Sequence, residues 1–171
     1  MPREVIRPTL RVIFESLDVD GNGVVGNKEV DHYLRGVGLN SWLARRATYK
    51  FFMGEIDVDE GDGSMSWREF VAGAHFFMPP AVVVGRDVRP DLVDSAFDTI
   101  AGAGRDEAGF AELRRYARQA IPWPLRPFSA PLLGVAATAV LKTLDANGDG
   151  ILEREDLRAV VADIVRERGG R

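Results

Sequence analysis

The 171-residue chain is long enough for one compact domain or two small lobes, and its 46% hydrophobic content indicates a packed core rather than a disordered chain. The absence of cysteine excludes disulfides, thiolate zinc sites and thiol catalysis, and the net charge of -4 argues against nucleic acid as the main partner. No apolar run approaches the length of a membrane span, and the opening residues lack the apolar segment of a secretion signal, so we expect a cytoplasmic protein with no membrane partner.

The stretch from Asp18 to Glu29 lies between two amphipathic helical patterns. Apolar residues recur at intervals of three and four over residues 10–17, and again over residues 30–37, which predicts a helix on each side. The stretch itself fits the spacing D-x-[DN]-x-[DN]-G-x5-E of a calcium-binding loop. An acidic, glycine-rich surface turn is the alternative, but a turn does not require all of these positions at once.

The ligand positions follow from the needs of calcium, a hard cation that takes about six to eight oxygens at roughly 2.3–2.6 Å. Alternate residues of a short loop can point inward, Gly23 supports the sharp turn at the sixth position, and Gly26 at the ninth leaves room for a water. Glu29 at the twelfth position is long enough to bind through both carboxylate oxygens. The predicted ligands are Asp18, Asp20, Asn22, the carbonyl of Val24, and Glu29.

A second helix–loop–helix unit follows, and its loop from Asp57 to Glu69 has thirteen residues, one more than the standard loop. Ile56 precedes Asp57 as Leu17 precedes Asp18, so we place the extra residue within 59–62. The predicted ligands are Asp57, Asp59, Asp62, the carbonyl of Ser64, and Glu69, with Ser66 binding directly or through water and Glu60 in reserve. The alternative is a distorted, empty loop. Ser66 and Glu69 also form a capping box for the next helix.

The third unit has lost the residues that bind an ion. The apolar pattern of residues 93–100 sets the register, which places Glu112 at the twelfth loop position. Ala101, Ala103 and Arg105 then stand at the first, third and fifth positions, so two ligands are missing and a cation replaces another. We predict a unit that keeps its fold without an ion. The alternative is an unusual site built from Asp106, Glu107 and Glu112.

The last unit follows a proline-rich stretch, residues 121–127, which we interpret as a packed connection, with a proline-binding partner as the alternative. An apolar pattern over residues 137–144 predicts the entering helix, and residues after position 165 are expected to fray. The twelfth loop position holds aspartate, one methylene shorter than glutamate, so we expect weaker discrimination against magnesium. The predicted ligands are Asp145, Asn147, Asp149, the carbonyl of Ile151, and Asp156, with Glu153 as a further candidate.

Four helix–loop–helix units over nearly the whole chain resemble the EF-hand superfamily, and the mixture of intact and vacant loops is similar to calerythrin and the sarcoplasmic calcium-binding proteins, in a prokaryotic type of member. The resemblance implies an all-α fold of two EF-hand pairs: hands 1 and 2 within residues 1–80, a connection at 81–90, and hands 3 and 4 within 91–171. It also implies that paired loops touch through a short antiparallel bridge at their eighth positions, Val25 with Met65 and Ala108 with Leu152.

We expect three calcium ions, in hands 1, 2 and 4, with magnesium as a competitor in hand 4. No enzymatic activity is expected, because metal binding accounts for the carboxylates and neither His32 nor His75 has an evident nucleophile nearby. The chain has only 4 Met, whereas sensors open a methionine-rich groove. This favours a monomeric calcium buffer or storage protein. The alternative is a sensor that changes conformation and regulates a protein target when calcium binds.

Overall fold

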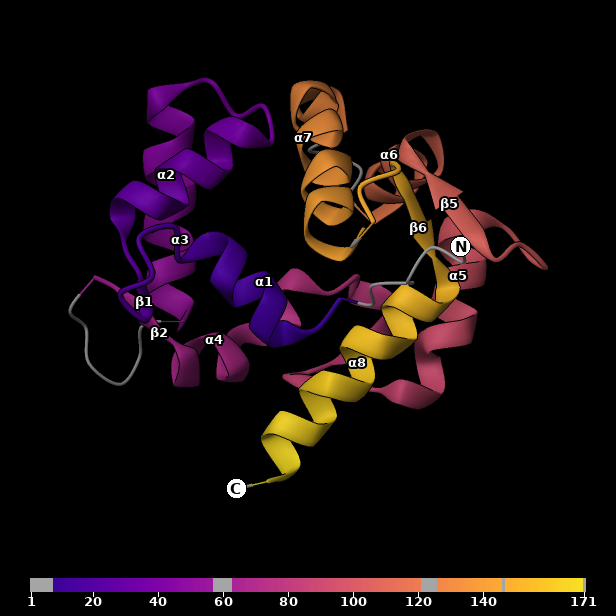
Figure 1. Cartoon of the computed structure of the whole chain (residues 1–171). Coiled ribbons are helices and arrows are strands. Elements are labelled where there is room, and N and C mark those ends of the chain that lie inside the picture. The colour runs from indigo at the N-terminus through magenta and orange to yellow at the C-terminus, as the bar shows by residue number, and fades with distance from the viewer. Residues whose placement is uncertain (1–7, 57–62, 121–125, 146, 171) are drawn as a thin grey trace, which may run out of the picture.

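The computed structural model describes residues 8–56, 63–120, 126–145 and 147–170, and within them a helix–loop–helix unit is repeated four times (Figure 1). The α-helices are α1 (Leu10–Leu17), α2 (Asn27–Gly36), α3 (Trp42–Ile56), α4 (Trp67–Gly73), α5 (Val93–Ala101), α6 (Phe110–Ala120), α7 (Arg126–Leu144) and α8 (Arg154–Gly169). The predicted all-α fold of EF-hand units is confirmed: α1–α2, α3–α4, α5–α6 and α7–α8 are hands 1 to 4.

Short antiparallel strands join the loops in pairs. Strand β1 (Val24–Val25) pairs with β2 (Met65–Ser66), and β5 (Glu107–Gly109) pairs with β6 (Ile151–Glu153). The register places Val25 opposite Met65 and Ala108 opposite Leu152, which confirms both bridges that the resemblance implied. All four of these side chains are buried. Each bridge therefore adds to the core beneath its pair and fixes the two loops relative to each other.

An aromatic cluster packs α1 against α4. The ring of Phe14 lies 5.4 Å from that of Trp67 in an edge-on arrangement and 5.3 Å from that of Phe70. Phe14 is only 2% exposed, so truncating it to alanine would cost about 3–5 kcal/mol of stability. The apolar spacing that predicted α1 thus points its inner face into the core of the first pair.

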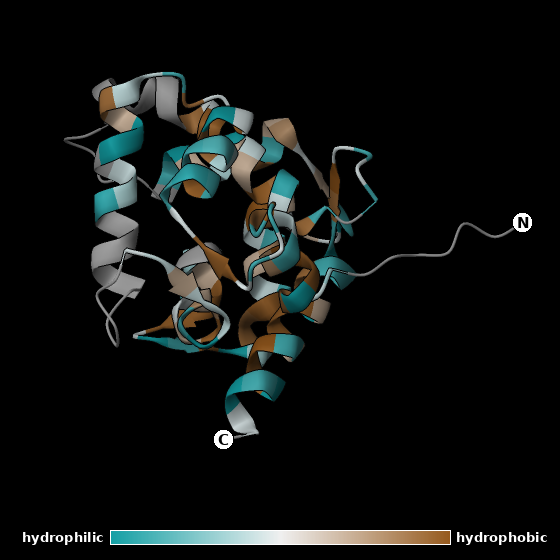
Figure 2. Cartoon of the chain, turned by 60° about the vertical axis from the view of Figure 1, so that its left-hand side comes forward, coloured by the Kyte–Doolittle hydropathy of each residue, from teal (hydrophilic) through white to brown (hydrophobic). Residues whose placement is uncertain are grey.

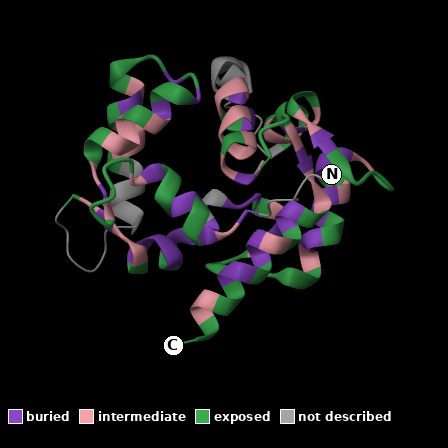
Figure 3. Ribbon diagram, viewed as in Figure 1, coloured by how far each residue is buried: buried purple, intermediate pink, exposed green. Residues whose placement is uncertain are grey.

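Helices α5 and α8 supply much of the core of the second pair. The apolar residues of both inner faces are buried, as predicted: Val93, Ala96, Phe97 and Ile100 on α5, and Leu157, Val160, Val161 and Ile164 on α8. Figure 3 shows this burial along α8, and Figure 2 shows hydrophobic residues where α8 enters the body and hydrophilic ones toward its C-terminal end. In Figure 1, α8 runs along one side of the molecule toward the helices of the first pair.

The C-terminal half of α8 fastens the first pair to the second, so the expected fraying after residue 165 is wrong. Asp163, which is 5% exposed, accepts a hydrogen bond of 2.7 Å from the backbone nitrogen of Leu10 at the start of α1. A negative charge is favourable there because it meets the positive end of the helix dipole. Arg168 donates to the carbonyl oxygen of Ala72 at 2.7 Å, near the end of α4. These charged residues tie α8 to elements that lie far earlier in the sequence.

The segment between the two pairs is ordered and partly buried. A 3₁₀ turn (Pro80–Val82) leads into a hairpin of β3 (Val83–Val84) and β4 (Asp87–Val88), followed by a second 3₁₀ turn (Pro90–Leu92). Val82 and Val88 are both buried in the core. The segment therefore packs as part of the body.

The proline-rich stretch leads into α7. The helix begins at Arg126, so Pro127 lies in its first turn, where proline is tolerated. Residues 121–125 lie outside the described part of the chain, so neither interpretation of the stretch is tested. Among the described residues, no helix is both long and apolar enough to cross a bilayer.

Candidate metal centres

Hand 1 brings three carboxylates together. Asp18 directly follows α1, and Glu29 lies in the first turn of α2. One oxygen each from Asp18, Asp20 and Glu29 lies within 4.8 Å of the other two. Like charges repel at such separations. The arrangement therefore fits a divalent cation that takes hard oxygen ligands, as calcium does.

Backbone amides hold these carboxylates in place. The amide of Gly23, at the sixth position, donates to Asp18 Oδ2 at 2.8 Å. Glu29 accepts from the amide of Gly26 through Oε2 at 2.9 Å and from the amide of Asp20 through Oε1 at 3.2 Å. Both oxygens of Glu29 therefore contact the loop, which is the orientation that a bidentate ligand requires.

The other two predicted ligands of hand 1 also lie on this loop. Asn22 Nδ2 donates to Asp20 Oδ2 at 3.2 Å, so its side chain lies beside a carboxylate of the cluster. Asn22 Oδ1 in turn accepts from the amide of Val24 at 2.9 Å. Val24 begins β1 opposite Ser66 of hand 2. The structure thus places all five predicted ligands of hand 1 on one closely hydrogen-bonded turn.

Hand 4 repeats this hydrogen-bonding scheme. Asp145 Oδ2 accepts from the amide of Gly150 at 2.7 Å, the same bond from sixth to first position as in hand 1. Asn147 Oδ1 accepts from the amide of Asp149 at 3.0 Å. Asp149 Oδ1 accepts from the amide of Ile151 at 2.9 Å. The local sequence therefore folds both loops in the same way.

The two loops also differ at the twelfth position, where hand 4 has Asp156 in place of a glutamate. Asp156 is 3% exposed, and its Oδ2 accepts from the amide of Glu153 at 3.3 Å. Among the described residues, the three converging carboxylates of hand 1 include Asp20 at the third position, where hand 4 has Asn147 instead of an acid.

Hand 2 is described only after its first six loop residues. The predicted ligands Asp57, Asp59 and Asp62, with the reserve Glu60, lie outside the described residues and stay predictions. Glu69 is 5% exposed, and its Oε1 has no hydrogen-bonding partner among the residues that the structure describes. A buried carboxylate oxygen of this kind requires a partner, and a metal ion would supply one.

The structure also places the residues at the end of the hand 2 loop. The hydroxyl of Ser66 lies 2.7 Å from Glu69 Oε2, and the Ser66 amide donates to the same oxygen at 2.9 Å, which confirms the capping box. Ser64, whose carbonyl is a predicted ligand, directly precedes β2. The hydroxyl of Tyr49 on α3 donates to the carbonyl of Gly63 at 2.7 Å, a support for the loop that the sequence did not reveal.

Hand 3 keeps the fold of a hand with different chemistry in its loop. Ala101 ends α5 and is buried, and Arg105 Nη1 lies 3.5 Å from Glu112 Oε1. A guanidinium thus faces the twelfth-position carboxylate. The alternative site is not assembled, because Asp106, Glu107 and Glu112, all described, do not come within 4.8 Å of one another. Asp106 instead contacts Arg154 of α8, and the sequence did not reveal this contact.

The fold and these loops define a class of structure: helix–loop–helix units, paired through their loops, with oxygen-bearing residues at calcium-loop positions, have the architecture of EF-hand proteins. A family model described as "EF hand" matches residues 138–161, which cover the end of α7, the loop of hand 4 and the first half of α8. The predicted EF-hand resemblance is confirmed, and calcium is supported as its ion.

Several known proteins are similar to this chain. It is 24% identical over 153 residues to an uncharacterized calcium-binding protein of Caenorhabditis elegans, which covers 90% of this chain and 59% of that protein. It is 36% identical over 66 residues to a 16 kDa calcium-binding protein of Schistosoma mansoni, which covers 34% of this chain and 45% of that protein. The chain thus spans less than two thirds of the length of either relative. A solved structure of a Streptomyces coelicolor calcium-binding protein aligns over 92% of this chain and 93% of its own, at 20% identity and a TM-score of 0.32.

Proposed function

We propose that the chain binds calcium at hands 1, 2 and 4, leaves hand 3 without an ion, and acts as a monomeric calcium buffer in the cytoplasm. The observation that carries this proposal is the convergence of Asp18, Asp20 and Glu29 in hand 1. The matching scheme in hand 4 and the orphaned Glu69 Oε1 support the other two ions.

The buffer role is supported by the packing of the helices. The inner faces of α1, α5 and α8 share one buried core that extends across both pairs. Asp163 and Arg168 fasten α8 to α1 and α4. Helices fastened together in this way resist moving apart when ions bind, in contrast to those of sensors that open a groove.

One observation favours the alternative of a sensor. A cavity of about 680 Å³ lies between α1 and α2 on one side and α6 and α7 on the other, with mainly apolar walls that include Leu17, Val30, Leu113 and Val140. This volume is within the usual range of about 300–1,000 Å³ for ligand pockets. Glu29 also lines the cavity, so an ion in hand 1 would act directly on its wall.

Two measurements test the proposal together. Calorimetric titration with calcium should give three ions per chain, and a titration repeated in magnesium should affect hand 4 most. Calcium should also raise the unfolding temperature, because mass action adds about 2.7 kcal/mol of stability for each site at a hundredfold excess of calcium over its Kd. A hydrophobic dye should respond little. Ion density in the third loop of a calcium-grown crystal would contradict the stoichiometry, and a strong, chelator-reversible dye response would favour the sensor.

A further inference from the structure

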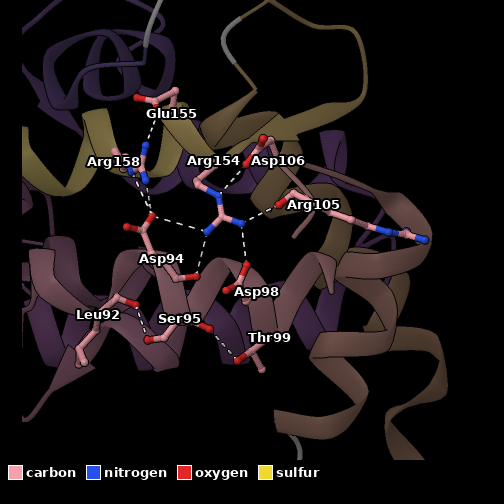
Figure 4. A network of polar contacts seen from close by, with 10 residues as sticks. All are labelled: Leu92, Asp94, Ser95, Asp98, Thr99, Arg105, Asp106, Arg154, Glu155 and Arg158. Atoms are coloured by element: carbon pink, nitrogen blue, oxygen red, sulfur yellow. Dashed lines mark hydrogen bonds and ion pairs between the residues drawn. The ribbon is translucent and has the colours of Figure 1, made fainter. Parts of the chain in front are cut away.

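Arg154, the first residue of α8, joins hand 4 to hand 3 (Figure 4). Its Nη2 lies 2.6 Å from Asp98 Oδ1 on α5, and its Nε lies 3.0 Å from Asp106 Oδ1 in the loop of hand 3. Nη2 also donates to the carbonyl of Arg105 at 2.7 Å, and the guanidinium lies 4.9 Å from the ring centroid of Phe97. The Arg154 side chain is only 11% exposed, whereas the side chains of its partners Asp98 and Asp106 are 42% and 84% exposed, so the guanidinium is shielded but its contact with Asp106 lies at the surface.

The backbone of Arg154 makes the same connection. Its amide donates to the carbonyl of Asp106 at 2.9 Å, just beyond the paired strands β5 and β6. Side chain and main chain therefore both hold the first turn of α8 against the loop of hand 3. That turn contains Asp156, the twelfth-position ligand predicted for hand 4, two residues after Arg154.

The loop of hand 3 offers α8 a support that needs no ion of its own. Arg105 lies across the loop from Glu112, with 3.5 Å between Nη1 and Oε1, where the fifth and twelfth positions of an intact hand would share a cation. The amide of Gly109 donates to Glu112 Oε2 at 3.2 Å, the same cap that Glu29 forms in hand 1. Hand 3 can therefore stay in place while hand 4 takes up or releases calcium.

We propose that Arg154 is a positioning residue for calcium binding, which fixes the first turn of α8, and Asp156 with it, against hand 3 before calcium enters hand 4. The inference rests on the proposed ion in hand 4. Ordering a chain segment opposes binding, so a turn that is already fixed binds the ion more tightly. The effect is largest for a short ligand, because Asp156 cannot make up for a displaced helix by reach.

Simple electrostatics predicts the opposite change in the calcium affinity of hand 4 when Arg154 is removed. A positive charge near a calcium site weakens binding, so its removal would strengthen hand 4. Positioning predicts that removal weakens hand 4. Arg158, one turn further along α8, is the matched control. It pairs with Glu155 and with Asp94, which Arg154 also contacts, and among the described residues it forms no hydrogen bond or ion pair with the loop of hand 3. Arg154→Gln and Arg158→Gln therefore remove the same charge from the same helix, but only the first releases the loop.

The experiment is a calcium titration of the full chain that is monitored by NMR, with one backbone amide as the reporter for hand 4 and one for hand 1. Gly150 donates to Asp145 and reports hand 4, while Gly23 donates to Asp18 and reports hand 1. Arg154→Gln should lower the calcium affinity of hand 4 by about 10-fold, the low end for partners that orient a metal ligand. Arg154→Lys should also weaken hand 4, because one ammonium cannot reproduce the fork that reaches several oxygens. Hand 1 should be unchanged in both, and Arg158→Gln should leave hand 4 unchanged.

A second variant approaches the same contact from hand 3. Asp106→Ala removes one side-chain acceptor of Arg154 without changing α8, and it should weaken hand 4 by less than Arg154→Gln does. The double variant should lose less than the sum of the two, because the residues share one contact. An unchanged or raised hand-4 affinity in Arg154→Gln, or an equal loss in Arg158→Gln, would overturn the positioning role. A wild-type Gly150 signal that ignores calcium would instead refute the proposed ion in hand 4.

Discussion

The loops of hands 3 and 4 are bridged by the same pair of strands, yet only the loop of hand 4 is arranged for an ion. In hand 4 the carboxylate of Asp145 accepts from the amide of Gly150, and positive φ angles occur at Gly148 (70°) and Gly150 (81°), the fourth and sixth positions. In hand 3 the positive φ angles occur at Gly102 (103°) and Gly104 (75°), the second and fourth positions. The turn of the vacant loop is therefore displaced toward its start.

The comparison separates what makes a hand fold from what makes it bind. Helix packing, the strand bridge and the cap between the ninth and twelfth positions are present in both hands. The residues at the first, third and fifth positions, with the turn at the sixth, differ. If hand 3 holds no ion, as proposed, it keeps its structural role, and the contact of Arg105 with Glu112 offsets the charge of the remaining carboxylate.

The largest expected change in calcium affinity comes from the glutamate at the twelfth position of hand 1, and the glutamate at the same position of hand 3 is its control. Glu29→Gln keeps the size of the side chain and an oxygen for the amide of Gly26, but removes the charge and one ligand oxygen, so the calcium affinity of hand 1 should fall on the order of 100-fold. Glu112→Gln makes the same change in hand 3 and should leave the number of bound ions unchanged. Calorimetric stoichiometry of both variants checks this. A lost ion in Glu112→Gln would mean that hand 3 binds after all.

A graft of hand-4 residues into hand 3 should give an intermediate effect. Ala101→Asp, Ala103→Asn and Arg105→Asp restore oxygen ligands, and Asp106→Gly is required as well, because no described residue other than glycine has a positive φ. The quadruple variant should bind one more calcium ion than the wild type, as counted by calorimetry or by mass spectrometry under native conditions.

The triple variant, which carries the three new ligand residues but keeps Asp106, is the control for the turn. It carries the same new ligands on a loop that bends at the wrong position, so its added site should be much weaker. Equal binding by both variants would show that the ligands alone direct the turn, and the displaced positive φ angles would then be a consequence of the missing ligands rather than an independent obstacle.

The sequence predicted those parts of the molecule that depend on local spacing. The helical faces follow from intervals of a few residues, and both strand bridges follow from the resemblance to EF-hand proteins; the structure has them where expected. The ligand positions of hands 1 and 4 also rest on local spacing and stay predictions. Arg154, Asp163 and Arg168 could not be assigned in this way. Their partners Asp106, Leu10 and Ala72 lie 48, 153 and 96 residues earlier, and no local pattern encodes such pairs. The charged end of α8 therefore resembled a solvated tail in the sequence.

The smallest expected effect concerns Asp156 and compares hand 4 with hand 1. An aspartate at the twelfth position either binds calcium through one oxygen, which loses a ligand, or draws the loop toward it, which strains the start of α8. Calcium accepts about six to eight ligands, whereas magnesium requires octahedral geometry near 2.0–2.1 Å, so a short acid penalises calcium more than magnesium. Hand 4 should therefore select calcium over magnesium less well than hand 1.

Asp156→Glu should raise the calcium affinity of hand 4 by several-fold and leave hand 1 unchanged, as measured by the calcium response of the Gly150 and Gly23 amides with and without magnesium. Asp156 is 3% exposed and accepts a hydrogen bond from the amide of Glu153, so its carboxylate already lies at the ninth residue of the loop. If calcium affinity is unchanged or falls, the loop has already adapted to the shorter acid, and the position of α8, rather than the reach of its twelfth residue, determines the strength of the site.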